Sequence, residues 1–190
     1  MNLKETEIPG VCILEPRVFR DSRGFFMESY NKRTLEKLGI ERDFVQDNHS
    51  KSTKFVLRGL HYQLGSPQAK LVSVVKGRVF DVAVDIRRGS PYFGKWVGVE
   101  LSEDNRRQFF VPEGFAHGFL VLSEEAEFQY KCSDFYAPSQ ERGLLWCDDR
   151  LGIQWPIPEG VEPILSEKDL AHPDLQKIDS RELPLYDEPS

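Results

Sequence analysis

Apolar and polar side chains alternate with a period of two along much of the chain, and this pattern limits the fold more than any other feature. It is clearest in "RVFDVAVDIRRG". There, Phe80, Val82, Val84 and Ile86 alternate with Val79, Asp81, Ala83 and Asp85. After the turn "RRGSPYFG" the same period resumes in "KWVGVEL". Because successive side chains of a strand point to opposite faces, short strands separated by turns predict an all-β sandwich or barrel.

Helical signals are few and short. The segment "NKRTLEKLG" places Leu35 and Leu38 three residues apart before a glycine, and in "SEKD" Ser166 and Asp169 have nearly the spacing of a capping box. We therefore expect a few short helices at the periphery. The chain has 190 residues, 39% of them hydrophobic, which suits one packed domain over residues 1–178 with a polar tail at 179–190.

The charge distribution excludes several classes of partner. The net charge is −6, and the 25 Lys and Arg residues are spread along the chain, which argues against nucleic acid but still allows a small anion held by a few arginines. No apolar run is long enough to cross a bilayer and the N-terminus "MNLKETEIPG" is charged, so we expect no membrane partner and a cytoplasmic location. Three cysteines without CxxC spacing predict reduced, structural thiols.

Two strands carry polar side chains on their apolar face. In "FFVPEGFAHGFLVL", His117 shares a face with Phe115 and Phe119, and in "EFQYKCSDFY", Tyr130 shares a face with Phe128. Both side chains are expected to point into the barrel. Either could be a core residue with a single hydrogen-bond partner, and two of them together favour a pocket.

The segment "LRGLHYQ" adds an arginine and a histidine to a third strand. On a regular pleat Arg58 and His61 face opposite ways, so they reach one ligand only if Gly59 forms a β-bulge or if the ligand extends past the end of the strand. Lys70 follows at the start of the next apolar run. A barrel interior that holds these groups is costly unless a ligand or their mutual contacts solvate them, and we therefore predict a binding pocket.

Five segments together resemble the dTDP-4-dehydrorhamnose 3,5-epimerase family. They are "PEGFAHGF", which has the PxGxxH form of the second cupin motif, and "LRGLHYQ", "QDNHS", "DSRGFFMESY" and "LSEKD". The resemblance implies a cupin-type jelly-roll barrel that needs no metal and no cofactor. In agreement, "HYQ" stands where metal-binding cupins carry an HxH pair, and His172, one of four histidines, falls in a proline-rich stretch that we expect to be peripheral.

The resemblance also implies a reaction and the residues that perform it. The substrate is dTDP-4-dehydro-6-deoxy-D-glucose, which is epimerised at C3 and C5 to dTDP-4-dehydro-L-rhamnose for dTDP-L-rhamnose biosynthesis. His61 would be the base, Tyr130 the proton donor on the opposite face of the sugar, and Lys70 the stabiliser of the enolate. Asp169 would orient His61, although its position also suits a cap for the helix that begins at Ser166.

The same resemblance assigns binding roles for the nucleotide sugar. Arg23, Arg58 and Lys168 would hold the diphosphate, His117 and Glu141 would line or adjoin the sugar pocket, and Glu28, Gln46 and Asn48 would hold the thymine and deoxyribose. Phe26 could stack on the base or belong to the core. A homodimer is implied, with part of each site supplied by the partner subunit through "DSRGFFMES".

Three alternatives remain open at this point. The chain could be a 3-only or 5-only epimerase, or a ketoisomerase, that acts on a related dTDP-4-keto sugar. It could be a metal-dependent cupin oxygenase, which would carry bound iron, manganese or zinc. It could also be a non-catalytic sugar-binding barrel, in which the polar interior residues bind without reacting.

Overall fold

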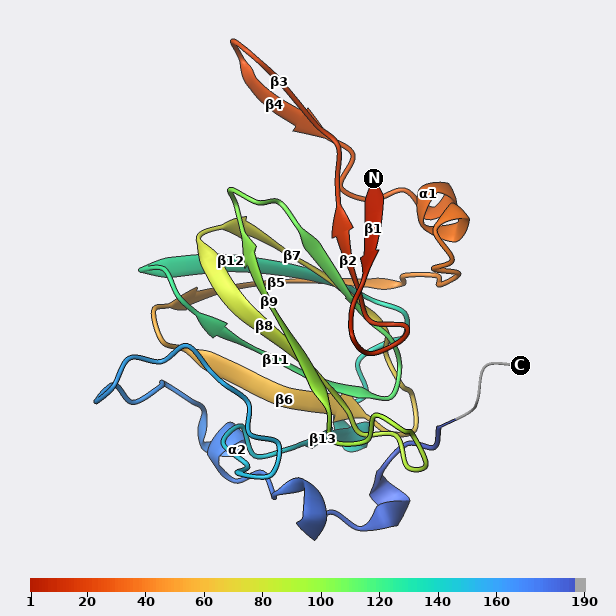
Figure 1. Ribbon diagram of the computed structural model, residues 1–190, viewed down its shortest axis with the longest axis vertical. Helices are drawn as coiled ribbons and strands as arrows, with labels where there is room; N and C mark the ends of the chain where they lie inside the picture. Colours follow the sequence, from red (N-terminus) through yellow and green to blue (C-terminus); the bar gives the residue numbers. More distant parts are fainter. Residues whose placement is uncertain (187–190) are drawn as a thin grey trace.

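The computed structural model describes residues 1–186, in which strands dominate and form two large sheets and a separate two-stranded hairpin (Figure 1). One sheet contains, in spatial order, β1 (Asn2–Glu5), β2 (Cys12–Glu15), β10 (Gln108–Val111), β7 (Lys70–Lys76), β12 (Glu125–Cys132) and β5 (Gln46–Thr53). The other contains β13 (Glu141–Gly143), β6 (Leu57–Gln63), β11 (Phe115–Val121), β8 (Arg78–Asp85) and β9 (Trp96–Ser102). The neighbouring strands within each sheet are antiparallel. The predicted all-β architecture is confirmed.

The main core lies between the two sheets. Phe109 and Phe128 from the six-stranded sheet pack there with Phe119 and Leu101 from the five-stranded sheet. A second apolar cluster covers the outer face of the five-stranded sheet, where Leu144 and the segment that follows it pack on β6, β8 and β11. The inner core covers one face of β11 and the outer cluster covers the other, so every residue of this strand is buried.

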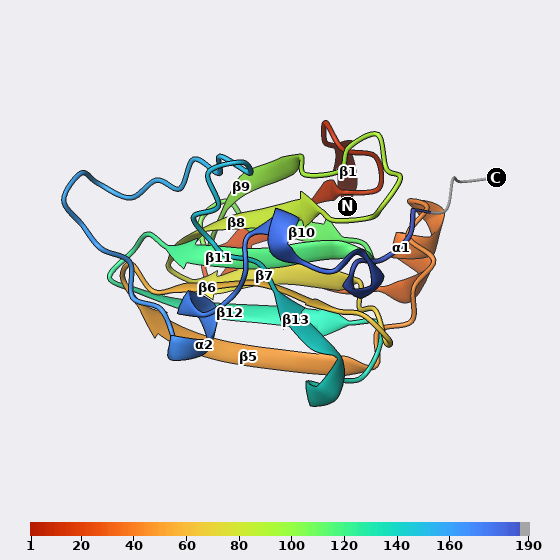
Figure 2. The same cartoon turned by 90° about the horizontal axis from the view of Figure 1, so that it is seen from below.

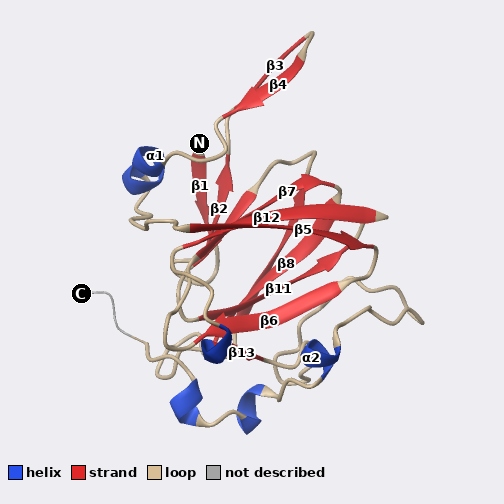
Figure 3. Ribbon diagram, turned by 180° about the vertical axis from the view of Figure 1, so that it is seen from behind, coloured by secondary structure: helices blue, strands red, loops and turns tan. Residues whose placement is uncertain are grey.

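Helices are short and peripheral, as predicted (Figure 3). The helix α1 (Lys32–Lys37) begins after Asn31, whose side chain accepts a hydrogen bond from the Thr34 amide, and it packs Leu35 against β2, β7 and β10. The helix α2 (Glu167–Leu170) begins after Ser166. The described part of the chain also contains three 3-10 turns: η1 (Pro138–Gln140), η2 (Leu175–Lys177) and η3 (Ser180–Glu182). No helix within residues 1–186 is both long and apolar enough to cross a membrane.

The segment after residue 178 runs beside β6 and β13 and contacts the barrel (Figure 2). Leu183 is buried in the outer cluster, the Tyr62 hydroxyl donates to the Glu182 carbonyl at 3.0 Å, and Pro184 accepts from the Arg88 amide at 2.8 Å. Residues 179–186 of the predicted tail thus pack on the five-stranded sheet, and residues 187–190 lie outside the described part of the chain.

A two-stranded hairpin, β3 (Val18–Asp21) and β4 (Gly24–Met27), projects away from the barrel (Figure 1). Its aromatic side chains are largely exposed: Phe19 and Phe25 are each 50% exposed, and Phe26 is 69% exposed. The Phe25 ring does touch the barrel, where the Arg106 guanidinium lies 3.5 Å from its centroid. Three large apolar side chains gathered on one projecting element form a surface that a monomer rarely leaves uncovered.

Candidate active site

A cavity of about 360 Å³ opens between the two sheets. Both sheets contribute polar side chains to it, His61 and His117 from the five-stranded sheet and Lys70 and Tyr130 from the six-stranded sheet. Eight of the residues predicted from sequence line it: Gln46, Asn48, Arg58, His61, Lys70, His117, Tyr130 and Glu141. A second cavity adjoins it, shares Arg58, His61, Tyr136 and Glu141 with it, and adds Lys168 and Asp169.

A β-bulge brings Arg58 and His61 to the same cavity. In the pairing of β6 with β11, His61 lies opposite His117 and Arg58 lies opposite Phe119, so that Gly59 and Leu60 together face one residue. Gly59 has φ +123°, and a Cβ built there would lie 2.5 Å from the Cα of Gly118. Glycine is therefore required both for the backbone conformation and for the close approach of the strands. Of the two sequence-based explanations, the structure shows the bulge.

His61 and Asp169 form a hydrogen-bonded pair at the edge of the cavity. The Nε2 of His61 lies 2.5 Å from the Oδ1 of Asp169, and the His61 side chain is 28% exposed. Burial opposes ionisation of Asp169, but its hydrogen bonds with His61 and Ser166 outweigh burial and hold its pKa below the usual value. An ionised carboxylate accepts, so Nε2 of His61 carries the hydrogen and Nδ1 is left with the lone pair of a base.

The helix α2 fixes the orientation of Asp169. The backbone amide of Asp169 donates to the Ser166 hydroxyl oxygen at 3.1 Å, and that hydroxyl donates to Oδ2 of Asp169 at 2.9 Å. The cap and the pairing with His61 were alternatives in the sequence, and in the structure both occur. Capping places Asp169 at a fixed point on a short helix, and its second oxygen is then directed at the histidine.

A second histidine–aspartate pair lies deeper in the barrel. The Nε2 of His117 lies 2.8 Å from the Oδ1 of Asp81, and both side chains are buried. Burial lowers the pKa of His117 and raises the pKa of Asp81, while the charge of each partner opposes these shifts. The His117 ring also stacks on Phe128, with ring centroids 6.3 Å apart. Asp81 had no predicted role, since in the sequence it is only a polar position within an alternating strand.

Lys70 and Tyr130 face the cavity from the six-stranded sheet. Burial lowers the pKa of Lys70, against the opposing effects of Cys132, Asp81 and Glu141. Burial also raises the pKa of Tyr130, so that its phenol keeps its proton at neutral pH. The cavity thus presents a lysine amine and a phenol proton donor on the side opposite His61.

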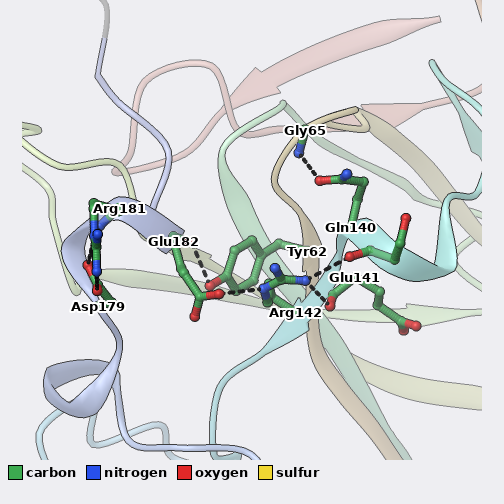
Figure 4. Close-up of polar contacts among 9 residues, drawn as sticks. Tyr62, Gly65, Gln140, Glu141, Arg142, Asp179, Arg181 and Glu182 are labelled. Carbon is green, nitrogen blue, oxygen red and sulfur yellow. Dashed lines mark hydrogen bonds and ion pairs between the residues drawn. The ribbon is translucent and has the colours of Figure 1, made fainter.

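Glu141 lines both cavities. Its Oε2 accepts from the Tyr136 hydroxyl at 2.6 Å and pairs with the ammonium group of Lys168. Burial alone would raise the pKa of Glu141, but these two partners lower it below the usual value. Figure 4 shows the support behind this strand: Arg142 donates to Glu182 at 3.1 Å, and the Gln140 side chain accepts from the Gly65 amide at 3.1 Å. Tyr136 is a lining residue that sequence analysis missed.

Three predicted binding residues lie away from the cavity and near or on the projecting hairpin. Arg23 pairs with Asp21 at 2.5 Å, and its side chain is 88% exposed. Phe26 is on β4, and Glu28 accepts a hydrogen bond from Asn31 at 2.9 Å. Within one chain these three residues do not meet the other predicted site residues.

The expectation that His172 is peripheral is wrong. Its ring packs edge-on against His61, with centroids 5.6 Å apart at 76°, and only 11% of its side chain is exposed. The segment after α2 turns back along β13, where Gly143 leaves room for the imidazole. No sequence pattern signals this contact, because the two histidines are 111 positions apart and only the covering segment brings them together.

Comparisons with known proteins identify the family of the chain. The family model described as dTDP-4-dehydrorhamnose 3,5-epimerase matches residues 5–177. The chain belongs to this family. It is 62% identical over 172 residues to the dTDP-4-dehydrorhamnose 3,5-epimerase of Shigella flexneri, a match that covers 90% of this chain and 93% of the relative.

Solved structures of family members confirm the cupin-type jelly roll. The Legionella pneumophila epimerase RmlC, solved with dTDP-4-keto-L-rhamnose, has a TM-score of 0.94 and 54% identity, covering 98% of each chain. ChmJ, a 3'-monoepimerase from Streptomyces bikiniensis solved with dTDP-quinovose, has a TM-score of 0.89 and 34% identity, covering 95% of this chain and 92% of its own. The epimerase fold is thus shared by proteins of more than one specificity.

Proposed function

We propose that this protein is an isomerase that converts dTDP-4-dehydro-6-deoxy-D-glucose to dTDP-4-dehydro-L-rhamnose by epimerisation at C3 and C5. One observation supports this proposal above all: His61, paired with Asp169, and Tyr130 line one cavity from opposite sheets. Inversion at carbon requires removal of a proton from one face and its replacement on the other. A base and an acid on opposite walls supply both steps.

The chemistry needs only the side chains of the cavity. A C–H bond beside the C4 ketone is acidic because its electron pair moves into the enolate. Nδ1 of His61 takes that proton, and Asp169 stabilises the resulting imidazolium. The ammonium group of Lys70 stabilises the negative oxygen, and the Tyr130 phenol returns a proton to the opposite face of the carbon. Proton exchange with water resets both groups, and the sequence repeats at the second carbon.

The remaining residues hold the nucleotide sugar. Arg58 and Lys168 supply positive charge for the diphosphate where the two cavities meet. His117, held by Asp81, lines the sugar pocket beside Glu141, and Gln46 with Asn48 offers amide groups to the thymine and deoxyribose. We expect the enzyme to act in the cytoplasm, to use no cofactor and to serve dTDP-L-rhamnose biosynthesis.

A homodimer completes the proposed site. Arg23, Phe26 and Glu28 lie outside the cavity of their own chain, and the hairpin that carries the first two projects from the barrel with exposed aromatic side chains. We infer that each hairpin reaches the nucleotide site of the partner subunit. Mixing an Arg23→Ala chain with a His61→Asn chain should then restore activity, because one site of the mixed dimer keeps both residues. Failure to restore activity in confirmed mixed dimers would contradict the exchange.

Isotope exchange in heavy water tests the reaction. The unmodified protein should incorporate deuterium at both C3 and C5 of the 4-keto sugar. Tyr130→Phe should lower product formation about 10²- to 10⁴-fold while deuterium still exchanges, because His61 continues to remove and return protons. Tyr92→Phe is the control, since Tyr92 packs on the core and does not line the cavity.

Deuterium at one carbon only would support the second candidate, a mono-epimerase, for which the similarity to ChmJ is the specific observation. Absence of exchange at either carbon, with binding retained, would point to a sugar-binding barrel. Turnover that depends on bound iron, manganese or zinc would support the cupin oxygenase.

A further inference from the structure

A third side chain, His172, lies beside the His61–Asp169 pair, and the proposed epimerase reaction does not use it. His61, Asp169 and His172 each offer one ligand atom, and these atoms lie within 4.8 Å of one another. The Nε2 of His172 lies 3.8 Å from the same Asp169 oxygen that meets His61. That nitrogen is buried and has no hydrogen-bond partner among the described residues. A buried ring nitrogen left without a partner beside a carboxylate is costly unless another group satisfies it.

We propose that His61, Asp169 and His172 form a binding site for a divalent transition-metal ion of the zinc type, and that the ion inhibits the enzyme. Two imidazoles and a carboxylate suit Zn²⁺, Co²⁺ or Ni²⁺ better than Mg²⁺ or Ca²⁺, which prefer oxygen ligands. Ligand atoms around zinc lie about 3.3 Å apart, for bonds of roughly 2.0–2.1 Å. Binding therefore needs His61 and Asp169, now 2.5 Å apart, to separate by about 0.8 Å, and His172, now 3.8 Å from Asp169, to approach it by about 0.5 Å. The two histidine nitrogens lie within 4.8 Å of each other and must close by up to about 1.5 Å, which rotation of the His172 ring supplies.

The surroundings of the three residues fit such a site. His61 lines both cavities, so an ion can enter from solvent and keep water as its fourth ligand. The Ser166 hydroxyl holds the other oxygen of Asp169 at 2.9 Å, which leaves the first oxygen to coordinate. Gly143 lies against the His172 ring, and a Cβ at that position would be 2.3 Å from Nε2. The ring can occupy its place only because residue 143 is a glycine.

The ion would stop proton transfer through the tautomer of His61. Coordination uses the lone pair of Nε2, so the hydrogen on that nitrogen must move to Nδ1 by exchange with water. Nδ1 then has no lone pair and cannot accept a proton from the sugar. No electron is transferred, and removal of the ion restores the original tautomer. The inhibition therefore rests on the proposed function, whereas binding of the ion does not.

Titration of the metal-free full-length protein with Co²⁺ and Zn²⁺, followed by visible absorption and calorimetry, tests the site. One ion should bind per chain, with the absorption of four- or five-coordinate Co²⁺. His172→Phe and His172→Ala should each weaken binding at least about tenfold, because loss of even an outer-shell partner often has that effect. His49→Ala is the matched control: His49 is exposed and pairs with Glu127 on the other sheet, so binding should be unchanged.

Turnover assays complete the test. Zn²⁺ should inhibit the unmodified enzyme and a chelator should reverse the effect, whereas the His172 variants should resist inhibition and Mg²⁺ should have no effect. Equal binding by the unmodified and His172 proteins, absence of stoichiometric binding, or stimulation of turnover by the ion would overturn the proposal. If the ion binds through His172 but the protein has no epimerase activity, the metal site stands and the proposed function fails.

Discussion

His61 with Asp169 and His117 with Asp81 are the same two side chains placed in two environments. The histidines lie directly opposite each other on β6 and β11. The His61 side chain is 28% exposed and its aspartate comes from a helix late in the chain, whereas His117 is 7% exposed and its aspartate comes from the adjacent strand β8. The same two side chains are thus partly open to water in one pair, which suits the proposed base, and enclosed in the other, which suits a fixed lining of the pocket.

The largest expected difference between the pairs is in turnover. His61→Asn should lower kcat about 10³-fold, within the usual contribution of a general base, while binding of dTDP is retained. His117→Asn should act mainly on KM, because in the proposed function His117 lines the sugar pocket and does not accept a proton from the sugar. Steady-state kinetics with a thermal melt of each folded variant measures both effects. Equal losses of kcat in the two variants would contradict the assignment of His61 as the base and of His117 as a lining residue.

The bulge that brings the pairs together gives the next largest effect. Gly59→Ala combines a positive φ with a clash against Gly118, so the free energy of unfolding should fall by roughly 3 kcal/mol. Gly39→Ala is the matched control, since Gly39 also has a positive φ of +84° but has open space around its missing Cβ. It should cost only about 1 kcal/mol. Denaturant unfolding measures both, and equal losses would show that close packing of the strands is unimportant.

The alternation of side chains was sufficient to predict the sheets, because a half-buried strand is encoded locally. It also predicted which residues line the cavity wherever an inward position carried a polar side chain, as at His117 and Tyr130. The bulge at Gly59 could be predicted only as one of two alternatives, since it becomes visible as a register shift against β11. One extra residue in a strand changes the face of every residue that follows.

Contacts made by covering segments could not be predicted in this way. His172 follows a four-residue helix in a region without periodicity, and its position depends on the space above Gly143. Asp81 was visible as a polar residue, but its partner His117 is 36 residues away and only the pairing of β8 with β11 brings them together. Local patterns report the face of a strand, and the identity of its neighbours depends on topology.

The same substitution at the two aspartates should separate stability from activity. Asp81→Leu leaves the buried His117 without its hydrogen-bond partner and should reduce the free energy of unfolding by about 1–3 kcal/mol. Asp169→Leu leaves His61 able to bond water, so the loss of stability should be below about 1 kcal/mol while kcat falls. Denaturant unfolding and steady-state kinetics on both variants measure these effects. A larger loss of stability in Asp169→Leu than in Asp81→Leu would contradict this division.

The smallest effect concerns the protonation of His117. Burial lowers the pKa of His117 below its ordinary value of 6.5, and the charge of Asp81 opposes this shift. Asp81→Asn removes the opposing charge, so the midpoint of the His117 imidazole in an NMR titration should lie below 6.5 in the unmodified protein and fall further in the variant. A midpoint that rises in Asp81→Asn would show that the carboxylate does not favour the imidazolium.

The sign of the accompanying change in stability follows from the same pKa difference. In the unfolded chain His117 takes up a proton at its ordinary pKa of 6.5, while the folded chain takes it up only at lower pH. Acidification from neutral pH through 6.5 therefore protonates the unfolded chain first and lowers the free energy of unfolding. Since Asp81→Asn widens this gap, the variant should lose stability more steeply with falling pH than the unmodified protein. Parallel slopes in thermal melts across this range would mean that the buried pair takes up and releases its proton as one unit.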